Sequence, residues 1–177
     1  MASPALPAID QLSKLPSGVQ GAVLDTLFEP SEDLRRLIVP IMQDHSFGDY
    51  AELIALVKSH LETLLRESRQ LSLLDSILRC HPRLGEKKVD SAQSRAEQAQ
   101  LQSQDEGEAQ ELAQANRDYE TAFPGLRYVV FVNGRSRSNL VEEIRLRIQR
   151  HEFRQERIDA IQAICDIAGD RAQKLSL

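Results

Sequence analysis

Hydrophobic positions along most of the chain repeat with the period of an α-helix. The clearest case is residues 49–66, where leucine, isoleucine and valine recur every three or four positions and form one apolar face. Pro30 ends an earlier helical run, because proline cannot continue a helix interior, and Ser31 is expected to cap the helix that follows. The same spacing predicts further helices over about 17–29, over 70–79, after Ser136 or Ser138, and over about 154–174.

Residues 91–116 carry a different pattern, rich in alanine, glutamine and glutamate and poor in large apolar residues. The composition predicts helix, with a break at Gly107. A helix that is polar nearly all round has little surface to bury. Two interpretations stay open: a solvent-exposed helix, or a helix that contributes polar side chains to a site.

Tyr128–Val132 is the one strongly β-like run in the sequence. A turn signal at 123–125 precedes it, and Asn133-Gly134 ends it. Because a lone strand has nothing to pair with, we expect a buried extended segment between helices. The fold class predicted is therefore all-α: a single domain over residues 1–177 with about 7–9 helices and one short extended segment. Residues 1–15 are expected to be loosely ordered around a short helix.

Composition narrows the possible functions. The 177 residues are 41% hydrophobic and 28% charged, which is ordinary for a soluble globular protein, and the absence of tryptophan predicts an aliphatic core. A net charge of −5 argues against nucleic acid as a partner. No apolar run is long enough for a membrane span, and the first residues do not resemble a signal peptide. Two cysteines, Cys80 and Cys165, favour free thiols in a reducing compartment.

His81 is the strongest candidate for chemistry. It follows the apolar helix predicted over 70–79, and Pro82 and Gly85 end that helix, so the side chain is expected just past a helix end. A histidine placed there can exchange protons near neutral pH, although a surface or capping role is the alternative. The four histidines show no metal-ligand spacing, and no phosphate loop or serine elbow is present, so neither a metal nor a nucleotide is predicted.

Several short motifs in colinear order resemble the OHCU decarboxylase family, where OHCU is 2-oxo-4-hydroxy-4-carboxy-5-ureidoimidazoline. His81-Pro82-Arg83-Leu84-Gly85 resembles the family's His-Pro-x-Leu-Gly signature, and Ser94-Arg95-Ala96-Glu97-Gln98 its Ser-x-x-Glu-Gln element. The remaining similarities, spread over about residues 20–175, are Leu27-Phe28-Glu29-Pro30-Ser31, Asn116-Arg117-Asp118-Tyr119 with Phe123-Pro124-Gly125, Tyr128 to Ser136, and Ile167 to Arg171.

The resemblance implies an all-helical carboxy-lyase of uric acid degradation. Members of the family convert OHCU to (S)-allantoin and carbon dioxide, need neither cofactor nor metal, and form homodimers in the peroxisome or the cytoplasm. For this chain it therefore implies a small-molecule substrate, no cofactor, a homodimer and an intracellular compartment, with neither a nucleic acid nor a membrane as partner.

The resemblance also implies roles for particular residues. His81 becomes the proton-transfer residue, and Glu97 an acidic partner that either orients His81 or crowds the departing carboxylate. Ser94 and Gln98, on one helix face with Glu97, are expected to hydrogen-bond the substrate, and Arg171 to neutralise its charge. The other substrate-binding residues implied are Pro82 and the backbone of Tyr128, Val129, Val130, Phe131 and Val132.

The chain departs from the family's pattern at three places. Glu32-Asp33 stands where the family often has Pro-Trp, Phe131-Val132 stands where Cys-Ala is usual, and the stretch from Gln93 to Gln114 is longer and richer in glutamine. These departures leave an alternative of another class: a catalytically inactive helical homologue that binds a ligand or a protein. A helical adaptor without a small-molecule site is a third interpretation.

Overall fold

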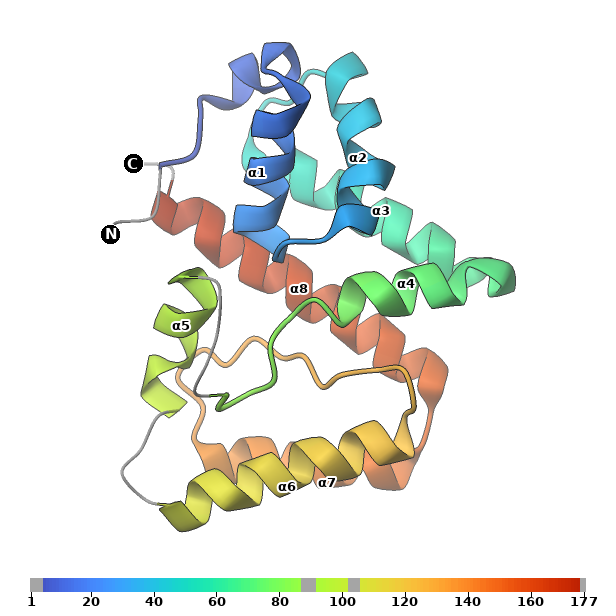
Figure 1. Cartoon of the computed structure of the whole chain (residues 1–177), viewed down its shortest axis with the longest axis vertical. Coiled ribbons are helices and arrows are strands. Elements are labelled where there is room, and N and C mark those ends of the chain that lie inside the picture. Colours follow the sequence, from blue (N-terminus) through green and yellow to red (C-terminus); the bar gives the residue numbers. More distant parts are fainter. Residues whose placement is uncertain (1–4, 87–91, 102–105, 176–177) are drawn as a thin grey trace.

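A computed structural model gives the fold, and it describes residues 5–86, 92–101 and 106–175. Within these ranges the regular elements are all helical, and no strand is present, so the all-α prediction is confirmed. The eight α-helices of the described residues are α1 (Ser17–Phe28), α2 (Glu32–Asp44), α3 (Tyr50–Arg66), α4 (Leu71–Leu78), α5 (Ala92–Gln98), α6 (Glu106–Ala122), α7 (Arg137–Arg150) and α8 (Phe153–Leu175) (Figure 1). Three 3-10 helices are η1 (Ile9–Lys14), η2 (Ser68–Gln70) and η3 (Ala99–Leu101).

Side-chain caps fix where several of these helices begin. The Ser31 hydroxyl accepts a hydrogen bond from the Leu34 amide at the start of α2, as predicted. Of the two serines considered for α7, Ser136 is the cap, with its hydroxyl 3.3 Å from the Asn139 amide. Capping satisfies amides that the first turn of a helix leaves unpaired, so local sequence sets these boundaries.

The break predicted at Gly107 is not found there. Gly107 is the second residue of α6, so the helix continues through it. The helical segment before it ends with η3 at Leu101, and Leu101 is almost fully buried. Glycine lowers helix propensity without forbidding helix, and here the packing of α6 outweighs that cost.

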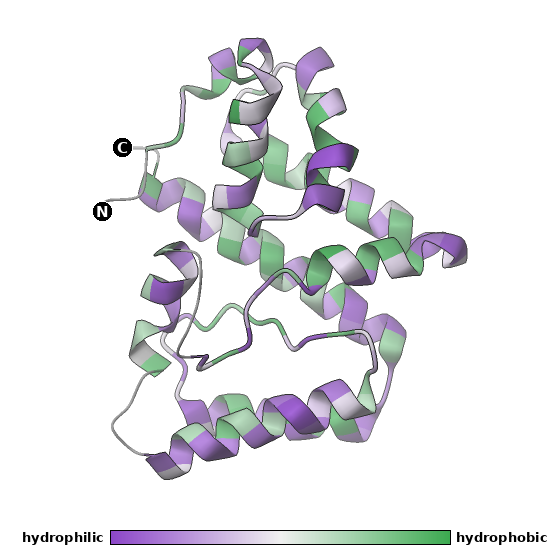
Figure 2. Cartoon of the chain, in the orientation of Figure 1, coloured by the Kyte–Doolittle hydropathy of each residue, from purple (hydrophilic) through white to green (hydrophobic). Residues whose placement is uncertain are grey.

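The helices form two groups that meet along α8. α1, α2, α3 and α4 pack on one another and on α8, and their apolar side chains make one core; Figure 2 shows α4 as mostly hydrophobic. α6 and α7 lie side by side on the other side of the molecule and hold a second core (Figure 1). Of residues 1–15, the structure describes 5–15. The side chain of Leu12, in η1, is fully buried in the first core.

Two non-helical segments run between these groups, at 79–86 and 123–136 (Figure 1). Along the second, successive side chains enter different cores: Val129 packs in the first, while Tyr128, Val130 and Val132 pack in the second. Alternation is the geometry of an extended chain, whose neighbouring side chains point to opposite faces. The β-like run is therefore the extended segment expected from sequence, buried on both faces between two helical groups.

Gly85 offers a test of how tightly the 79–86 segment is held. Its φ is +73°, and a Cβ there would lie 3.0 Å from Cδ2 of Leu112. We predict that Gly85→Ala lowers the free energy of unfolding by about 1–2 kcal/mol, measured by urea denaturation, because of strain and this contact. Gly169→Ala, inside α8 with open space around it, is the control and is expected to raise stability by up to about 1 kcal/mol. Equal stability of Gly85→Ala and wild type would contradict the account.

Candidate active site

A pocket of about 240 Å³ opens where the two non-helical segments, 79–86 and 123–136, and α5 meet the last turns of α8. Ten of the eleven predicted site residues line it: His81, Pro82, Ser94, Glu97, Gln98, Tyr128, Val129, Val130, Phe131 and Val132. The eleventh, Arg171, is not among the lining residues and lies buried behind them. Sequence motifs that are up to 51 residues apart, from His81 to Val132, thus meet in one cavity.

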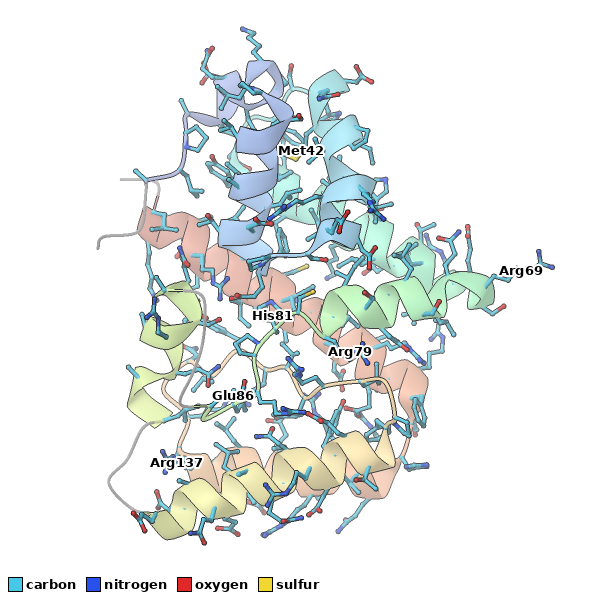
Figure 3. The ribbon with its side chains drawn as sticks, in the orientation of Figure 1. Met42, Arg69, Arg79, His81, Glu86 and Arg137 are labelled. Carbon is cyan, nitrogen blue, oxygen red and sulfur yellow. The ribbon has the colours of Figure 1, made fainter. Side chains whose placement is uncertain are left out.

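His81 lies just beyond the end of α4, as predicted, and its side chain is only 4% exposed. Figure 3 shows it in the middle of the molecule, between the two helical groups. The main-chain carbonyl of His81 accepts a hydrogen bond of 2.8 Å from Arg127. Its ring atom Nε2 is buried and has no hydrogen-bond partner among the described residues. A buried polar atom without a partner is costly, and in a pocket it marks a place for a ligand.

The loop that follows His81 is held by side chains from two neighbouring elements. The Gln98 side-chain oxygen accepts from the Gly85 amide at 2.8 Å, and Asn116 of α6 donates to the Leu84 carbonyl at 3.0 Å. Arg83 makes a two-pronged ion pair with Glu120 of α6, at 2.6 and 2.7 Å. These contacts fix the loop on both sides, and the position of the His81 side chain follows from them.

Burial keeps the His81 imidazole neutral. Burial, together with the positive charge of Arg171, lowers the pKa of His81 to about 4, although the charge of Glu29 acts in the opposite direction. A neutral imidazole has one nitrogen that accepts a proton. At neutral pH the site therefore offers a buried proton acceptor in the wall of the pocket.

Arg171 is the centre of a buried ionic cluster rather than a pocket-facing cation. Its guanidinium binds both carboxylate oxygens of Glu97, at 2.7 and 2.9 Å, and Oε1 of Glu29 at 2.7 Å. It also donates to the Ser94 hydroxyl at 3.0 Å and to the carbonyls of Thr26 and Leu27. The N–H groups of Arg171 are thus directed to protein groups. The sequence predicted a contact with the substrate instead.

Glu29 is the site residue to which the sequence analysis assigned no role. It is 3% exposed, it follows the last residue of α1 with φ +73°, and it accepts a hydrogen bond of 2.5 Å from Ser94. Burial raises the pKa of Glu29, but the charge of Arg171 and the Ser94 hydroxyl outweigh burial, so the pKa is lowered. The motif around it, Phe28-Glu29-Pro30-Ser31, was the signal, yet sequence spacing alone did not bring it near His81.

Glu97 has a different partner from the one considered first. Both of its oxygens are bound to Arg171, and the charges that shift the pKa of His81 are those of Arg171, Glu29 and Arg127. Glu97 is partly exposed and lines the pocket from α5. Of the two roles open to Glu97, this geometry favours a carboxylate presented to the cavity over one that orients His81.

The backbone of the extended segment supplies unpaired donors. In the part of the chain that the structure describes, no amide N–H between residues 128 and 132 donates to a protein group. The carbonyls of Phe131 and Val132, by contrast, accept from Arg135. Backbone amides that lack protein partners at a pocket wall are ready to bind a ligand's oxygen atoms.

The three departures from the family's pattern lie at different distances from the pocket. Glu32 and Asp33 are in the first turn of α2, away from the pocket lining, and Asp33 accepts a hydrogen bond from Ser76. Phe131-Val132 lies on the pocket wall. The polar segment from 93 to 114 provides Ser94 and Gln98, both buried, so α5 contributes polar groups to a site.

Neither a metal-ligand cluster nor a membrane-crossing helix is found among the described residues. No group of three or more histidine, cysteine, aspartate or glutamate side chains among them is arranged to hold a metal ion. None of the helices that the structure describes combines the length and the hydrophobicity that crossing a membrane requires.

The pKa of His81 predicts a pH dependence of stability. Between about pH 6.5 and pH 4 the unfolded chain binds a proton at this residue while the folded chain does not. The free energy of unfolding should therefore fall as the pH falls through this window, by up to about 1.4 kcal/mol per pH unit. Urea denaturation at several pH values measures the slope, which His81→Gln should reduce and His45→Gln, at an exposed histidine, should not. Equal slopes for wild type and His81→Gln would refute the neutral, buried imidazole.

Comparisons with known proteins agree with the geometry. A solved structure described as (S)-allantoin synthase has the same fold, with a TM-score of 0.63 and 18% sequence identity. The match covers 95% of this chain and 54% of that one, so the chain spans about half the length of that protein. No curated protein matches the sequence. A sequence model of the family described as OHCU decarboxylase matches residues 13–173, nearly the whole chain. The protein therefore belongs to the OHCU decarboxylase family.

Proposed function

We propose that this protein decarboxylates OHCU to (S)-allantoin, the last step of the conversion of urate to allantoin. The observation that carries the proposal is the buried neutral His81, whose Nε2 lacks a protein partner in a pocket walled by unpaired backbone amides. Membership of the family and the fold shared with an (S)-allantoin synthase support the same reaction.

The reaction needs a protein group that carries protons, because the C=N bond of the substrate itself accepts the electron pair. When the carbon–carboxylate bond breaks, carbon dioxide leaves and its electron pair moves toward the adjacent C=N bond of the ring. The product then takes up two protons, one on nitrogen and one on the new stereogenic carbon; the substrate hydroxyl supplies one and solvent the other. The protein has to hold the carboxylate out of the ring plane and protonate one face only. Orientation of this kind supplies a large part of the rate enhancement of many enzymes.

His81 is suited to that proton transfer. Being neutral at pH 7, the imidazole takes the proton of the substrate hydroxyl as the carbon–carbon bond breaks. The same ring then returns a proton to the carbon from its own side of the pocket, which makes the product (S)-allantoin. Glu29, whose charge favours the protonated ring, stabilises the imidazolium that forms in between.

The other walls hold the substrate. The amides of 128–132 bind the ring oxygens, and Ser94 and Gln98 of α5 face the ureido group. Pro82, next to His81, packs against the ring. Glu97 presents its carboxylate to the departing carboxylate, and Arg171 holds Glu97, Ser94 and Glu29 in place from behind the pocket.

The proposal extends to assembly, cofactors and compartment. We propose a homodimer that acts without cofactor or metal in the peroxisome or the cytoplasm, and the support for each is the family resemblance. The alternative of an inactive homologue draws on the departures, of which only Phe131-Val132 lies on the pocket wall. Since those two residues contribute backbone groups to the proposed site, the substitutions there are compatible with catalysis.

The activity assay uses OHCU generated freshly in the presence of the protein, with optical rotation followed over time. Wild type is expected to accelerate the loss of OHCU and to give (S)-allantoin. His81→Ala should slow this reaction by about 10²–10⁴-fold, because the proton carrier is lost, and Glu97→Gln should lower turnover with the helical circular dichroism unchanged. A racemic product formed by wild type at the uncatalysed rate would favour the inactive homologue.

Arg171 should matter for stability as well as activity. Arg171→Met removes the cation shared by two carboxylates, and breaking a buried ion pair costs about 3–5 kcal/mol. We expect a loss of that size in urea denaturation at pH 7. Arg36→Met, which breaks an exposed pair with Glu32, is the control and should leave the curve unchanged. If the two variants are equally stable, the cluster does not hold the site together.

A further inference from the structure

Arg135 follows the extended segment in the chain and binds the backbone of its last two residues. Its guanidinium donates to the carbonyl of Phe131 at 2.6 Å and to the carbonyl of Val132 at 3.3 Å. The third arm donates to Glu143 of α7 at 2.6 Å. The Val132 carbonyl also accepts from the main-chain amide of Arg135, at 3.0 Å. Arg135 lines a separate open groove beside α7 and α8 and is not among the residues that line the catalytic pocket.

The other end of the segment is held from the same side. Glu143 also accepts from Arg147 at 2.5 Å, and the Arg147 guanidinium lies over the Tyr128 ring, 5.0 Å from its centroid. Arg147 is 15% exposed, so this contact is largely shielded from water. One carboxylate, that of Glu143, therefore joins two guanidinium groups that hold the segment at both of its ends.

This arrangement controls which way the backbone amides point. A trans peptide is planar, so its carbonyl and its N–H lie on opposite sides. When Arg135 draws the carbonyls of Phe131 and Val132 toward its own side chain, the N–H groups of Val132 and Asn133 are directed away from it. Val132 and Asn133 both line the catalytic pocket. In a sheet, a neighbouring strand would fix the direction of the amides, whereas here the Arg135 side chain does so.

We propose that Arg135 is a positioning residue for the reaction: by holding two carbonyls toward its own side chain, it presents the amides of Val132 and Asn133 to the substrate ring. The assignment rests on the proposed function, since that function defines which ligand the amides bind. Arg135 acts through the backbone and touches neither the substrate nor His81. A guanidinium is needed because its planar fork serves two carbonyls and a carboxylate at once, which an ammonium group does not.

The test compares Arg135→Met with Arg135→Lys and with Arg157→Met in the OHCU assay. Misdirected amides weaken substrate binding, so Arg135→Met should lower kcat/KM by about 10- to 100-fold, mainly through KM. Arg135→Lys should recover only part of the loss. Arg157→Met breaks a comparable ion pair, with Asp75, remote from the pocket, and should stay within about twofold of wild type.

Two results would overturn the proposal: Arg135→Met with an unchanged KM, or Arg157→Met with a loss as large as that of Arg135→Met, which would show that lowered stability is the cause. If Arg135→Met does not fold, Glu143→Gln replaces it, because it weakens the hold on both guanidinium groups. A severalfold rise in KM is then expected, and an unchanged KM again counts against the proposal.

A second readout separates this inference from the proposed function. In ¹H–¹⁵N NMR spectra, Arg135→Met should move above all the amide signal of Val132, whose peptide carbonyl at Phe131 loses its partner, and abolish the response of that signal to added (S)-allantoin. Wild type that leaves OHCU unconverted would refute the proposed function. The spectra without ligand would still test whether Arg135 orients the backbone amides of Val132 and Asn133. Amide signals at wild-type positions in Arg135→Met would refute the positioning role.

Discussion

The site depends on one buried guanidinium. Arg171 of α8 binds Glu29 at the end of α1 and Glu97 and Ser94 of α5, so three helices that are distant in sequence converge on a single charge. Such a cluster is stable only while every member is present, because a buried carboxylate that loses its cation is costly. The cluster sets the back wall of the pocket and, with burial, keeps His81 neutral. The same guanidinium thus shapes the pocket and, after burial, contributes to the neutral state of His81.

The second constraint is the extended segment, which the fold has to support without a sheet. Its side chains are satisfied by packing into two cores, and its carbonyls at 131 and 132 by Arg135. The amides of residues 128–132 donate to no protein group among the described residues and are available for a substrate. An irregular segment is costly in a helical protein unless its polar groups find partners, and here the unused groups coincide with the site.

The sequence predicted the helices, the extended segment and the place of His81, because these follow from local spacing, prolines and caps. It also brought Ser94, Glu97 and Gln98 to one helix face. It did not predict that Arg171 binds protein carboxylates instead of facing the pocket, or that Glu29 joins the site, since both depend on contacts between residues more than 60 positions apart. The break expected at Gly107 was wrong because packing of α6 outweighs the low helix propensity of glycine. Long-range ionic contacts were thus the part of the site beyond the reach of sequence spacing.

A crystal structure with (S)-allantoin bound would test the central claim most directly. The account predicts the ring against the backbone of residues 128–132, the ureido group toward Ser94 and Gln98, and Nε2 of His81 on the face that carries the hydrogen of the stereogenic carbon. Allantoin bound at a different place, or in this pocket with that hydrogen facing away from His81, would contradict it.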